Sequence, residues 1–120
     1  MSEIDIDTSE EQKMRTALAS RQDFEARRML RYLSMPDLTR TPGSPIKEIV
    51  DRILASPYFQ DLDVIKTPEI VPADISFDLF DFPADHPARS KSDTYYADDQ
   101  HILRTHTTVM WYYYLQDEAV

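Results

Sequence analysis

Residues 81–115, DFPADHPARSKSDTYYADDQHILRTHTTVMWYYYL, are the most distinctive part of this 120-residue sequence. They contain His86 and His106, Arg89 and Arg104, the only tryptophan and five of the seven tyrosines. Large aromatic and cationic side chains gather in this way where a protein builds a pocket or an interface. The segment therefore predicts a binding site.

The overall composition limits the class of protein. The length fits one small domain or a part of a larger one. Cysteine is absent, which excludes disulfides and thiolate metal sites and fits an intracellular setting. The net charge of -9 argues against a free-standing nucleic-acid binder, because phosphate contacts need clustered Lys and Arg. Any nucleic acid must meet this chain locally or through a partner's surface, and we expect no DNA partner. No apolar run has transmembrane length and the N-terminus is acidic, so we expect a cytoplasmic protein without a membrane segment.

The single glycine, Gly43, excludes several nucleotide-binding loops. A Walker loop, a dinucleotide-binding fingerprint and a kinase-type loop each need two or more glycines for close approach of the backbone to phosphate. The patterns G-x-S-x-G, H-E-x-x-H and C-x-x-C do not occur either. These exclusions remove the commonest short signatures of NTPases, hydrolases and zinc enzymes.

The first forty residues are expected to form an N-terminal helical segment. Residues 1–8 are acidic and are predicted to be frayed. Ser9, followed by two glutamates, predicts the start of a helix. Ser20, with Asp23 three residues later, indicates either a second short helix or a weak point within one helix. We treat residues 1–40 as one unit.

Three arginines lie on the polar side of this segment, at positions 27, 28 and 31. We interpret Arg27, Arg28 and Arg31 as a solvated helix face and not as an RNA site, because charged helix faces are usually exposed to water.

The strongest helix signal in the sequence begins at Ser44. Serine suits an N-cap, and the following Pro45 suits the first helical position. Apolar residues then recur with helical spacing, at Ile46, Ile49, Val50, Ile53 and Leu54. This apolar face needs a partner, which is either a sheet in the same chain or another subunit.

Three segments have the composition of β-structure. Residues 63–71 predict a strand interrupted by Pro68, which belongs at an edge or an interface because proline donates no hydrogen bond. Residues 94–97 and 101–104 predict two strands joined by a short turn. A last helix is expected from near Thr107 onward.

Four consecutive large aromatic residues, 111–114, belong to this last helix. At about 100° per residue they surround a helix and cannot all face one core. We therefore expect some of them to contact another chain or segment.

Two blocks of the distinctive segment resemble the catalytic domain of phenylalanyl-tRNA synthetase alpha chains, which are class II aminoacyl-tRNA synthetases. The blocks are DHPARSKSDTYY and ILRTHTT, and the family order is FDAL-N-x-P-x-D-HPAR, then an acidic-Thr-aromatic segment, then L-R-T-H-T-S. The matching residues are Phe77, Asp78, Leu79, Pro83, Asp85, His86, Pro87, Ala88, Arg89, Asp93, Thr94, Tyr95, Leu103, Arg104, Thr105, His106 and Thr107.

The resemblance implies an α+β fold. N-terminal helices would be followed, over residues 41–120, by the first part of a class II antiparallel-sheet catalytic domain, truncated. The layout of residues 45–71 resembles motif 1 of class II synthetases, which forms much of the subunit interface in that family. Residues 90–92, SKS, depart from the usual Asp-Met-Gln-like triplet, and Thr108 stands where serine is common.

The resemblance also implies an amino-acid pocket lined by His106, Thr107 and Thr108. A neutral imidazole nitrogen and a hydroxyl can both accept hydrogen bonds from the ammonium group of phenylalanine. The alternative is that His106 is an ordinary hydrogen-bonded histidine and Thr108 a helix cap. With the family match we favour the pocket.

His86, Arg89 and Tyr96 are implied to lie near ATP or the acceptor end of tRNA. Aromatic side chains such as Tyr96 can stack on unpaired bases, although packing in the pocket wall is the alternative. For Arg89 the alternative is an ion pair with Asp85 or Asp93 that pins the loop.

By this resemblance the intact protein is a phenylalanine-tRNA ligase. It would activate phenylalanine with ATP and Mg2+, transfer it to tRNA(Phe), and pair with a beta chain in a heterotetramer. The Arg-x-Glu pair of motif 2 and the Gly-rich motif 3 do not follow the hairpin. We therefore expect no catalytic residue and no metal ligand in these 120 residues, and no aminoacylation by them alone. Two alternatives stay open: a non-catalytic interaction module related to synthetases, or a related synthetase for another amino acid.

Overall fold

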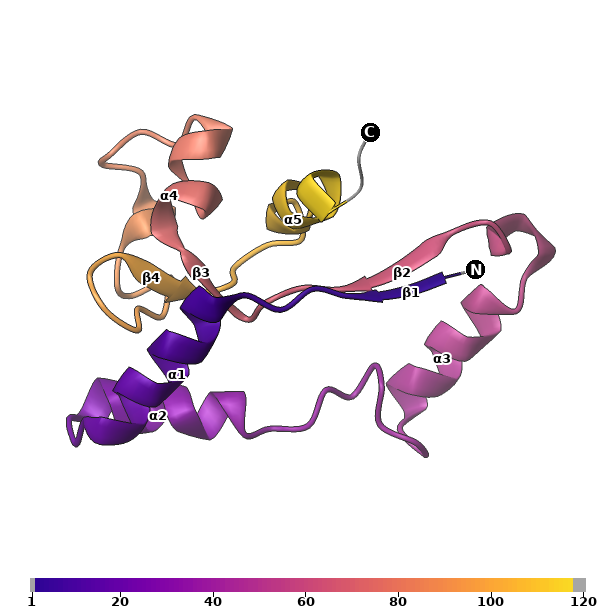
Figure 1. Ribbon diagram of the computed structural model, residues 1–120, viewed down its shortest axis with the longest axis horizontal. Helices are drawn as coiled ribbons and strands as arrows, with labels where there is room; N and C mark the ends of the chain where they lie inside the picture. The colour runs from indigo at the N-terminus through magenta and orange to yellow at the C-terminus, as the bar shows by residue number, and fades with distance from the viewer. Residues whose placement is uncertain (1, 118–120) are drawn as a thin grey trace.

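A computed structural model describes residues 2–117 as an α+β body with an extended arm (Figure 1). The elements in chain order are β1 (Ser2–Asp5), α1 (Ser9–Ser20), α2 (Phe24–Leu33), α3 (Pro45–Leu54), η1 (Pro57–Phe59), β2 (Asp63–Lys66), β3 (Ile70–Pro72), α4 (Ala73–Ser76), η2 (Asp78–Phe80), η3 (Pro87–Arg89), β4 (His101–Leu103) and α5 (Val109–Asp117). The radius of gyration is 16.1 Å, whereas a compact chain of this length would have about 14 Å. The difference reflects the arm, and the mixture of helices and small sheets confirms the α+β class.

A two-stranded antiparallel sheet, β3 with β4, lies at the centre of the body. Ile70 pairs with Leu103 and Val71 with Ile102. Because successive strand residues point to opposite faces, Ile70 contributes to one core and Val71 to another. The predicted hairpin forms, but residues 94–97 contribute an isolated bridge at Tyr96 instead of a full strand.

Two apolar cores lie against this sheet. The first joins α1 and α2 to β3, and its buried residues are Met14, Leu18, Ala26, Met29, Ile70 and Ala97. The second joins α4 and α5 to the same strands, and its buried residues are Val71, Phe77, Ile102, Val109 and Tyr113. Each fully buried large side chain contributes about 1.5–3 kcal/mol, so the sheet is held by helices on both sides.

The N-terminal segment contains two helices, and Asp23 separates them. Its carboxylate accepts a hydrogen bond from the backbone N–H of Ala26 at 3.1 Å and caps α2. The cap of α1 is Thr8, whose hydroxyl accepts from the N–H of Glu11 at 3.2 Å. The sequence-based assignment of this cap to Ser9 was wrong by one position, because a cap must precede the first residue with helical backbone angles.

Arg21 attaches the start of α2 to the hairpin. It forms a 2.8 Å ion pair with Asp23 and donates a second hydrogen bond to the carbonyl oxygen of Ala97. The hydrogen bond from Arg21 lowers the pKa of Asp23 to about 2. The α2 cap therefore stays ionised over the whole ordinary pH range.

Residues 2–5 form β1, so the expectation of a frayed segment was wrong for the described residues of 1–8, and residue 1 lies outside them. β1 runs parallel to β2, with Ile4 opposite Ile65, and the N–H of Ile6 donates to Lys66 at 2.8 Å. Isoleucines alternate with acids in this stretch, which is the pattern of a half-buried strand. The strand depends on pairing with β2, about sixty residues further along the chain, which local sequence does not indicate.

The corner between β2 and β3 is held from both sides by charged side chains. Glu11, which is 7% exposed, accepts hydrogen bonds from the N–H groups of Ile70 and the residue before it, at 3.0 and 2.5 Å. Arg104 donates to the carbonyl oxygens of Thr67 and Pro68 at 3.1 and 2.8 Å. Burial lowers the pKa of Arg104. The two side chains replace the strand-to-strand bonds that this corner cannot make.

We predict that Glu11→Ala destabilises the chain by about 2–4 kcal/mol, because two buried backbone N–H groups lose their acceptor. Glu11→Gln keeps an acceptor oxygen and should lose roughly half as much. Urea unfolding followed by circular dichroism measures both. Glu25→Ala, on the exposed side of α2, is the control, and equal losses in Glu11→Ala and Glu25→Ala would contradict the prediction.

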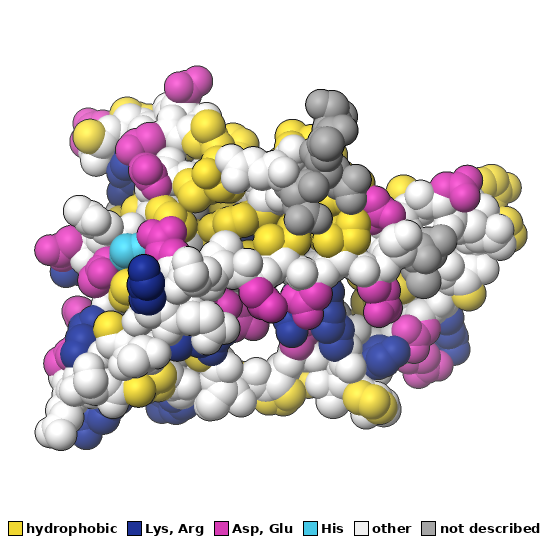
Figure 2. Space-filling model, viewed as in Figure 1, with side chains coloured by type: hydrophobic (Ala, Val, Ile, Leu, Met, Phe, Trp, Pro, Cys, Tyr) yellow, Lys and Arg dark blue, Asp and Glu magenta, His cyan; other side chains and the backbone are white. Residues whose placement is uncertain are grey.

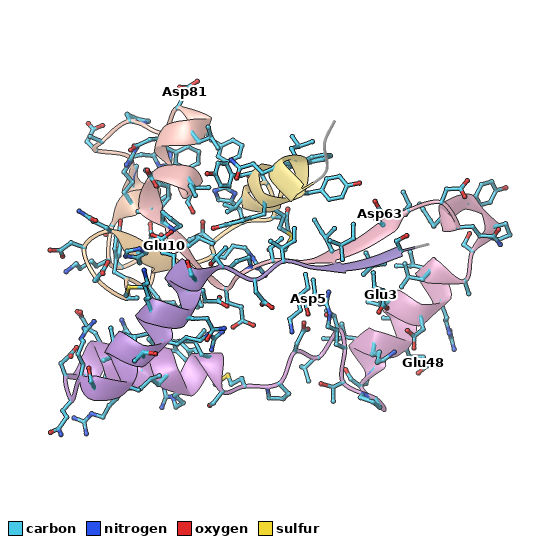
Figure 3. The ribbon with its side chains drawn as sticks, viewed as in Figure 1. Glu3, Asp5, Glu10, Glu48, Asp63 and Asp81 are labelled. Carbon is cyan, nitrogen blue, oxygen red and sulfur yellow. The ribbon has the colours of Figure 1, made fainter. Side chains whose placement is uncertain are left out.

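His101 links the hairpin to α1. Its Nε2 lies 2.6 Å from Glu10, which is labelled in Figure 3, and its Nδ1 lies 2.8 Å from Asp98. Only a protonated ring has two N–H groups and can donate to both carboxylates. Burial alone would lower the pKa of His101, but the hydrogen bonds with Glu10 and Asp98 outweigh it and raise the pKa above its ordinary value.

This link should make stability depend on pH. Because the folded pKa of His101 is raised, its contribution is complete below the ordinary histidine value of about 6.5 and is lost as pH rises through the folded value. We expect the wild type to lose more stability than His101→Gln over that interval. Thermal unfolding between about pH 5 and pH 9 measures this. If stability changes with pH equally in the two proteins, His101 does not contribute to the pH dependence.

The arm consists of the β1–β2 ribbon and α3 (Figure 1). As predicted, Ser44 caps α3 by accepting from the N–H of Ile46 at 3.2 Å. Three residues of its apolar face, Ile46, Ile49 and Ile53, stay 46%, 59% and 49% exposed. Within residues 2–117 these side chains are covered only in part, so another subunit stays a predicted partner for this face.

One edge of α3 lines a groove of about 730 Å³ against the ribbon, which includes Val50 and Leu54. Glu3 and Asp5 lie on the side of β1 toward α3 (Figure 3), opposite Lys47. Charged side chains line this groove, which is therefore not an apolar pocket. Within residues 2–117 no helix is long and apolar enough to cross a bilayer.

Candidate functional site

The two motif blocks meet around Phe82. The ring of Phe82 lies 4.7 Å from that of His86 and 6.0 Å from that of His106, measured between centroids. Phe77 lies 5.6 Å from Phe82 on the core side, and Phe80 meets His106 edge-on at 5.7 Å. The HPAR turn and the His-Thr-Thr segment are therefore neighbours in space.

His106 has hydrogen-bond partners on both ring nitrogens. Its Nε2 lies 3.1 Å from the carbonyl oxygen of Ser76, which can only accept, so Nε2 carries a proton. Its Nδ1 contacts the hydroxyl of Thr108. In the neutral ring Nδ1 accepts from that hydroxyl, and the oxygen of Thr108 keeps lone pairs for another donor. Thr108 is exposed at the surface.

Thr107 lies elsewhere. It lines a groove of about 390 Å³ between α5 and β2, together with Met110 and Trp111. Apolar side chains are exposed where α5 approaches the ribbon (Figure 2). The structure thus brings His106 and Thr108 together and places Thr107 in a separate groove.

The HPAR turn is a rigid one-turn 3-10 helix, η3. The Nδ1 of His86 accepts from the N–H of Ala88 at 3.0 Å, and Pro87 fixes the backbone between them. The hydroxyl of Tyr96 donates to the carbonyl oxygen of Arg89 at 2.6 Å, and its half-buried ring packs against the second core. Both side chains hold the turn in place.

Arg89 pins this turn to η2. Its guanidinium forms a 2.6 Å ion pair with Asp78, donates to the carbonyl oxygen of Phe82, and lies 5.1 Å from the centre of the Phe77 ring. The alternative interpretation from the sequence was correct about a pinning contact but wrong about the partner, which it named as Asp85 or Asp93.

The reason lies in the backbone between η2 and η3. Asp81 has a left-handed conformation, with φ of 60°, and this turn brings η2 back beside η3. Sequence spacing favoured the nearer acids, whereas the turn selects Asp78. Arg89 also lines an open groove of about 650 Å³ whose other charged residues include Asp74 and Asp99. This acidic lining repels phosphate, so the site as described offers ATP a poor place there.

Two buried polar atoms of this site have no hydrogen-bond partner among the described residues: Oγ of Ser76 and Nε of Arg89. Such atoms are rare in folded proteins and usually meet water or a ligand. No group of three or more His, Asp or Glu side chains within residues 2–117 is arranged to hold a metal ion. Mg2+ is usually held by one or two carboxylates together with water and substrate phosphates, so the expected use of Mg2+ stays a prediction.

Comparison with known proteins identifies the family. Residues 28–120 match the family model described as "tRNA synthetases class II core domain (F)". The chain belongs to this family. The match confirms the resemblance to class II synthetases, and it begins within α2, ahead of the predicted boundary at residues 40/41, which stays a prediction. The last three residues of the predicted 41–120 unit lie outside the described residues.

Several curated relatives of this class II chain share one name. The phenylalanine-tRNA ligase alpha subunit of Mycoplasmoides gallisepticum is 37% identical over 78 residues, covering 63% of this chain and 23% of the relative. That of Methylibium petroleiphilum is 35% identical over 109 residues, covering 82% and 32%. The mitochondrial phenylalanine-tRNA ligase of Saccharomyces cerevisiae is 64% identical over 33 residues, covering 28% and 7%. The chain thus spans less than a third of these relatives. No solved structure matches it.

Two contributors to the class II site were absent from the sequence-based list. Phe82 lies between the two histidines, and its place beside Pro83 in the motif block was a usable signal. Ser76 supplies a backbone carbonyl to His106, and a backbone group leaves no mark in a sequence.

We predict that Arg89 acts as a structural pin. Arg89→Met should destabilise the chain by about 1–3 kcal/mol, because the carbonyl oxygen of Phe82 and the carboxylate of Asp78 lose a charged donor. Urea unfolding measures the loss. Asp85→Asn is the control and should leave stability unchanged. An Arg89→Met protein with wild-type stability would remove the pinning role.

Proposed function

We propose that these residues belong to a phenylalanine-tRNA ligase alpha chain, which activates phenylalanine with ATP and transfers it to tRNA(Phe). The observation that carries this proposal is the family match over residues 28–120, together with 35% identity to a relative of that name across 82% of this chain. The ATP and Mg2+ that the reaction needs would be held by residues beyond those described.

Within the site we propose a division of roles between two residues. Both ring nitrogens of His106 are occupied, whereas the oxygen of Thr108 can still accept. Thr108 would accept a hydrogen bond from the ammonium group of phenylalanine. His106 would position that hydroxyl by accepting its proton at Nδ1. Thr107 is proposed as a pocket residue only through the motif, since it lines the groove beside α5.

The proposal extends to partners and location. The alpha-subunit names of most relatives support pairing with a beta chain, and the exposed face of α3 is a suitable surface. The relative from Saccharomyces cerevisiae is named without a subunit and as mitochondrial. Size-exclusion chromatography with and without a beta chain tests the pairing, and the cytoplasmic location stays a prediction.

A non-catalytic module related to synthetases is the second candidate. These 120 residues contain one glycine, Gly43, and no Gly-rich motif 3, and they span less than a third of the relatives' length. The reading frame downstream of the Val120 codon separates the two candidates. Continuation into an Arg-x-Glu pair and a Gly-rich segment supports the ligase, and an immediate stop codon supports the module.

A related synthetase for another amino acid is the third candidate, since the methyl group of Thr108 narrows the pocket. Thermal shift with each of the standard amino acids tests it. If another amino acid raises the unfolding temperature more than phenylalanine does, that amino acid becomes the proposed substrate, and the proposed reaction stays an aminoacylation.

We predict that Thr108→Val, made in the intact protein, raises the KM for phenylalanine in pyrophosphate exchange by about tenfold or more, because a hydrogen bond to a charged group is worth roughly 1.5–3 kcal/mol. Thr108→Ser keeps the hydroxyl and should stay near the wild type. Thr16→Val, at an exposed position on α1, is the matched control. If Thr16→Val and Thr108→Val have equal effects, the proposed role of the hydroxyl is wrong.

A separate measurement tests the positioning role of His106. The geometry requires the neutral ring to carry its proton on Nε2, which nitrogen-15 NMR of the histidine ring distinguishes directly. A proton on Nδ1 would mean that His106 donates to Thr108, and the proposed division of roles would fail.

A further inference from the structure

The outer face of α2 carries an exposed cluster of arginines and aromatic rings. At about 100° per residue, Phe24, Arg27, Arg28 and Arg31 fall on the helix face opposite the buried Ala26. Phe24 is 69% exposed, and basic side chains gather over this end of the molecule (Figure 2). The hairpin adds Tyr95, which is 39% exposed, beside α2.

Stacking holds the cluster in a fixed arrangement. The guanidinium carbon of Arg28 lies 4.7 Å from the ring centre of Tyr95 and 5.4 Å from that of Phe24. Arg31 lies 5.4 Å from the ring of Tyr32, whose centre is 5.1 Å from that of Tyr95. A guanidinium that stacks by its face keeps its N–H groups at the edge, where an anion can reach them.

The charge of the cluster is not neutralised locally. Within residues 2–117, Arg27, Arg28 and Arg31 take part in no ion pair, whereas Arg15, Arg21, Arg40, Arg52 and Arg89 all do. The whole sequence has a net charge of -9. Acids are plentiful, yet none pairs with these three arginines. This arrangement favours an anionic partner from outside the chain.

We propose that this α2 face, with Tyr95, binds single-stranded RNA. The inference rests on the proposed function only in taking that RNA to be tRNA. Phosphates would meet the arginine N–H groups, and unpaired bases would stack on the exposed parts of the Phe24 and Tyr95 rings. The interpretation of Arg27, Arg28 and Arg31 as a merely solvated face is replaced by this proposal.

The chemistry favours RNA over an acidic peptide. A peptide of Asp and Glu offers carboxylates but no flat rings. It would contact the arginines, but nothing in it would stack on the exposed aromatic rings. Single-stranded RNA offers both phosphates and rings. The position also fits, because Tyr95 on the cluster adjoins Tyr96, whose hydroxyl is bonded within the candidate site.

The test is fluorescence anisotropy with a labelled single-stranded RNA of about 12 nucleotides, a length that spans one such surface. The triple variant Arg27→Gln, Arg28→Gln, Arg31→Gln should weaken binding about tenfold or more and reduce the slope of log Kd against log salt by about 2. The matched control is Lys47→Gln, Arg52→Gln, Lys66→Gln on the arm, which removes the same charge and should leave binding within about twofold.

Stacking is tested apart from charge. Tyr95→Leu should weaken RNA binding about tenfold, whereas Tyr58→Leu, which alters a tyrosine that is 91% exposed on the arm, should have no effect. Circular dichroism confirms that each variant is folded. No binding by the wild type, or equal losses in the two triple variants, overturns the proposal. The proposal is also overturned if Tyr95→Leu binds RNA as tightly as the wild type and poly-glutamate displaces the RNA completely. That result would indicate an acidic peptide as the partner.

RNA binding is measured without ATP or phenylalanine, so the two proposals fail separately. RNA binding that depends on the α2 face supports this inference even if phenylalanine does not bind. If phenylalanine binds but the α2-face variants do not change RNA affinity, this inference is overturned and the proposed function stands.

Discussion

The corner at Pro68 depends on two charged side chains, and much of the structure follows from it. Proline donates no hydrogen bond, so the chain between β2 and β3 cannot continue the ladder. Glu11 supplies the missing acceptor from α1, and Arg104 supplies the missing donor from the end of β4. Three segments that are distant in sequence are fixed at one point. Because Arg104 precedes His106 by two residues, the same contact also sets where the candidate site begins.

The local elements could be predicted from the sequence wherever short-range chemistry decides them. Ser44 and Pro45 define the start of α3, as predicted. A second helix start at Ser20 was one of two predictions, but Ser20 is the last residue of α1 and the cap of α2 is Asp23 itself. β1 and the ion pair between Arg89 and Asp78 were not predicted, because both depend on partners that other parts of the chain bring close. The family resemblance proposed candidate site residues, which stay predictions, and it did not say which of them hold the fold and which face outward.

The motif block turns out to serve two purposes. The backbone of the HPAR turn is hydrogen-bonded by the side chains of His86 and Tyr96, and Arg89 donates to Asp78. Thr108 keeps an oxygen directed at solvent. The polar groups of this block therefore mostly hold one rigid loop, whereas the exposed Thr108 is the residue proposed to meet a ligand.

The parallel β1–β2 ribbon has a consequence for the order of folding. Its partners Ser2 and Asp63 are about sixty residues apart, and closing a loop of that length costs roughly 3–4 kcal/mol of chain entropy. A two-stranded ribbon is marginal by itself, so β1 gains its place only after the body has formed. During synthesis the first strand must wait for a partner that leaves the ribosome several seconds later, at about 5–20 residues per second. The start of the chain is thus among the last parts of the protein to become ordered.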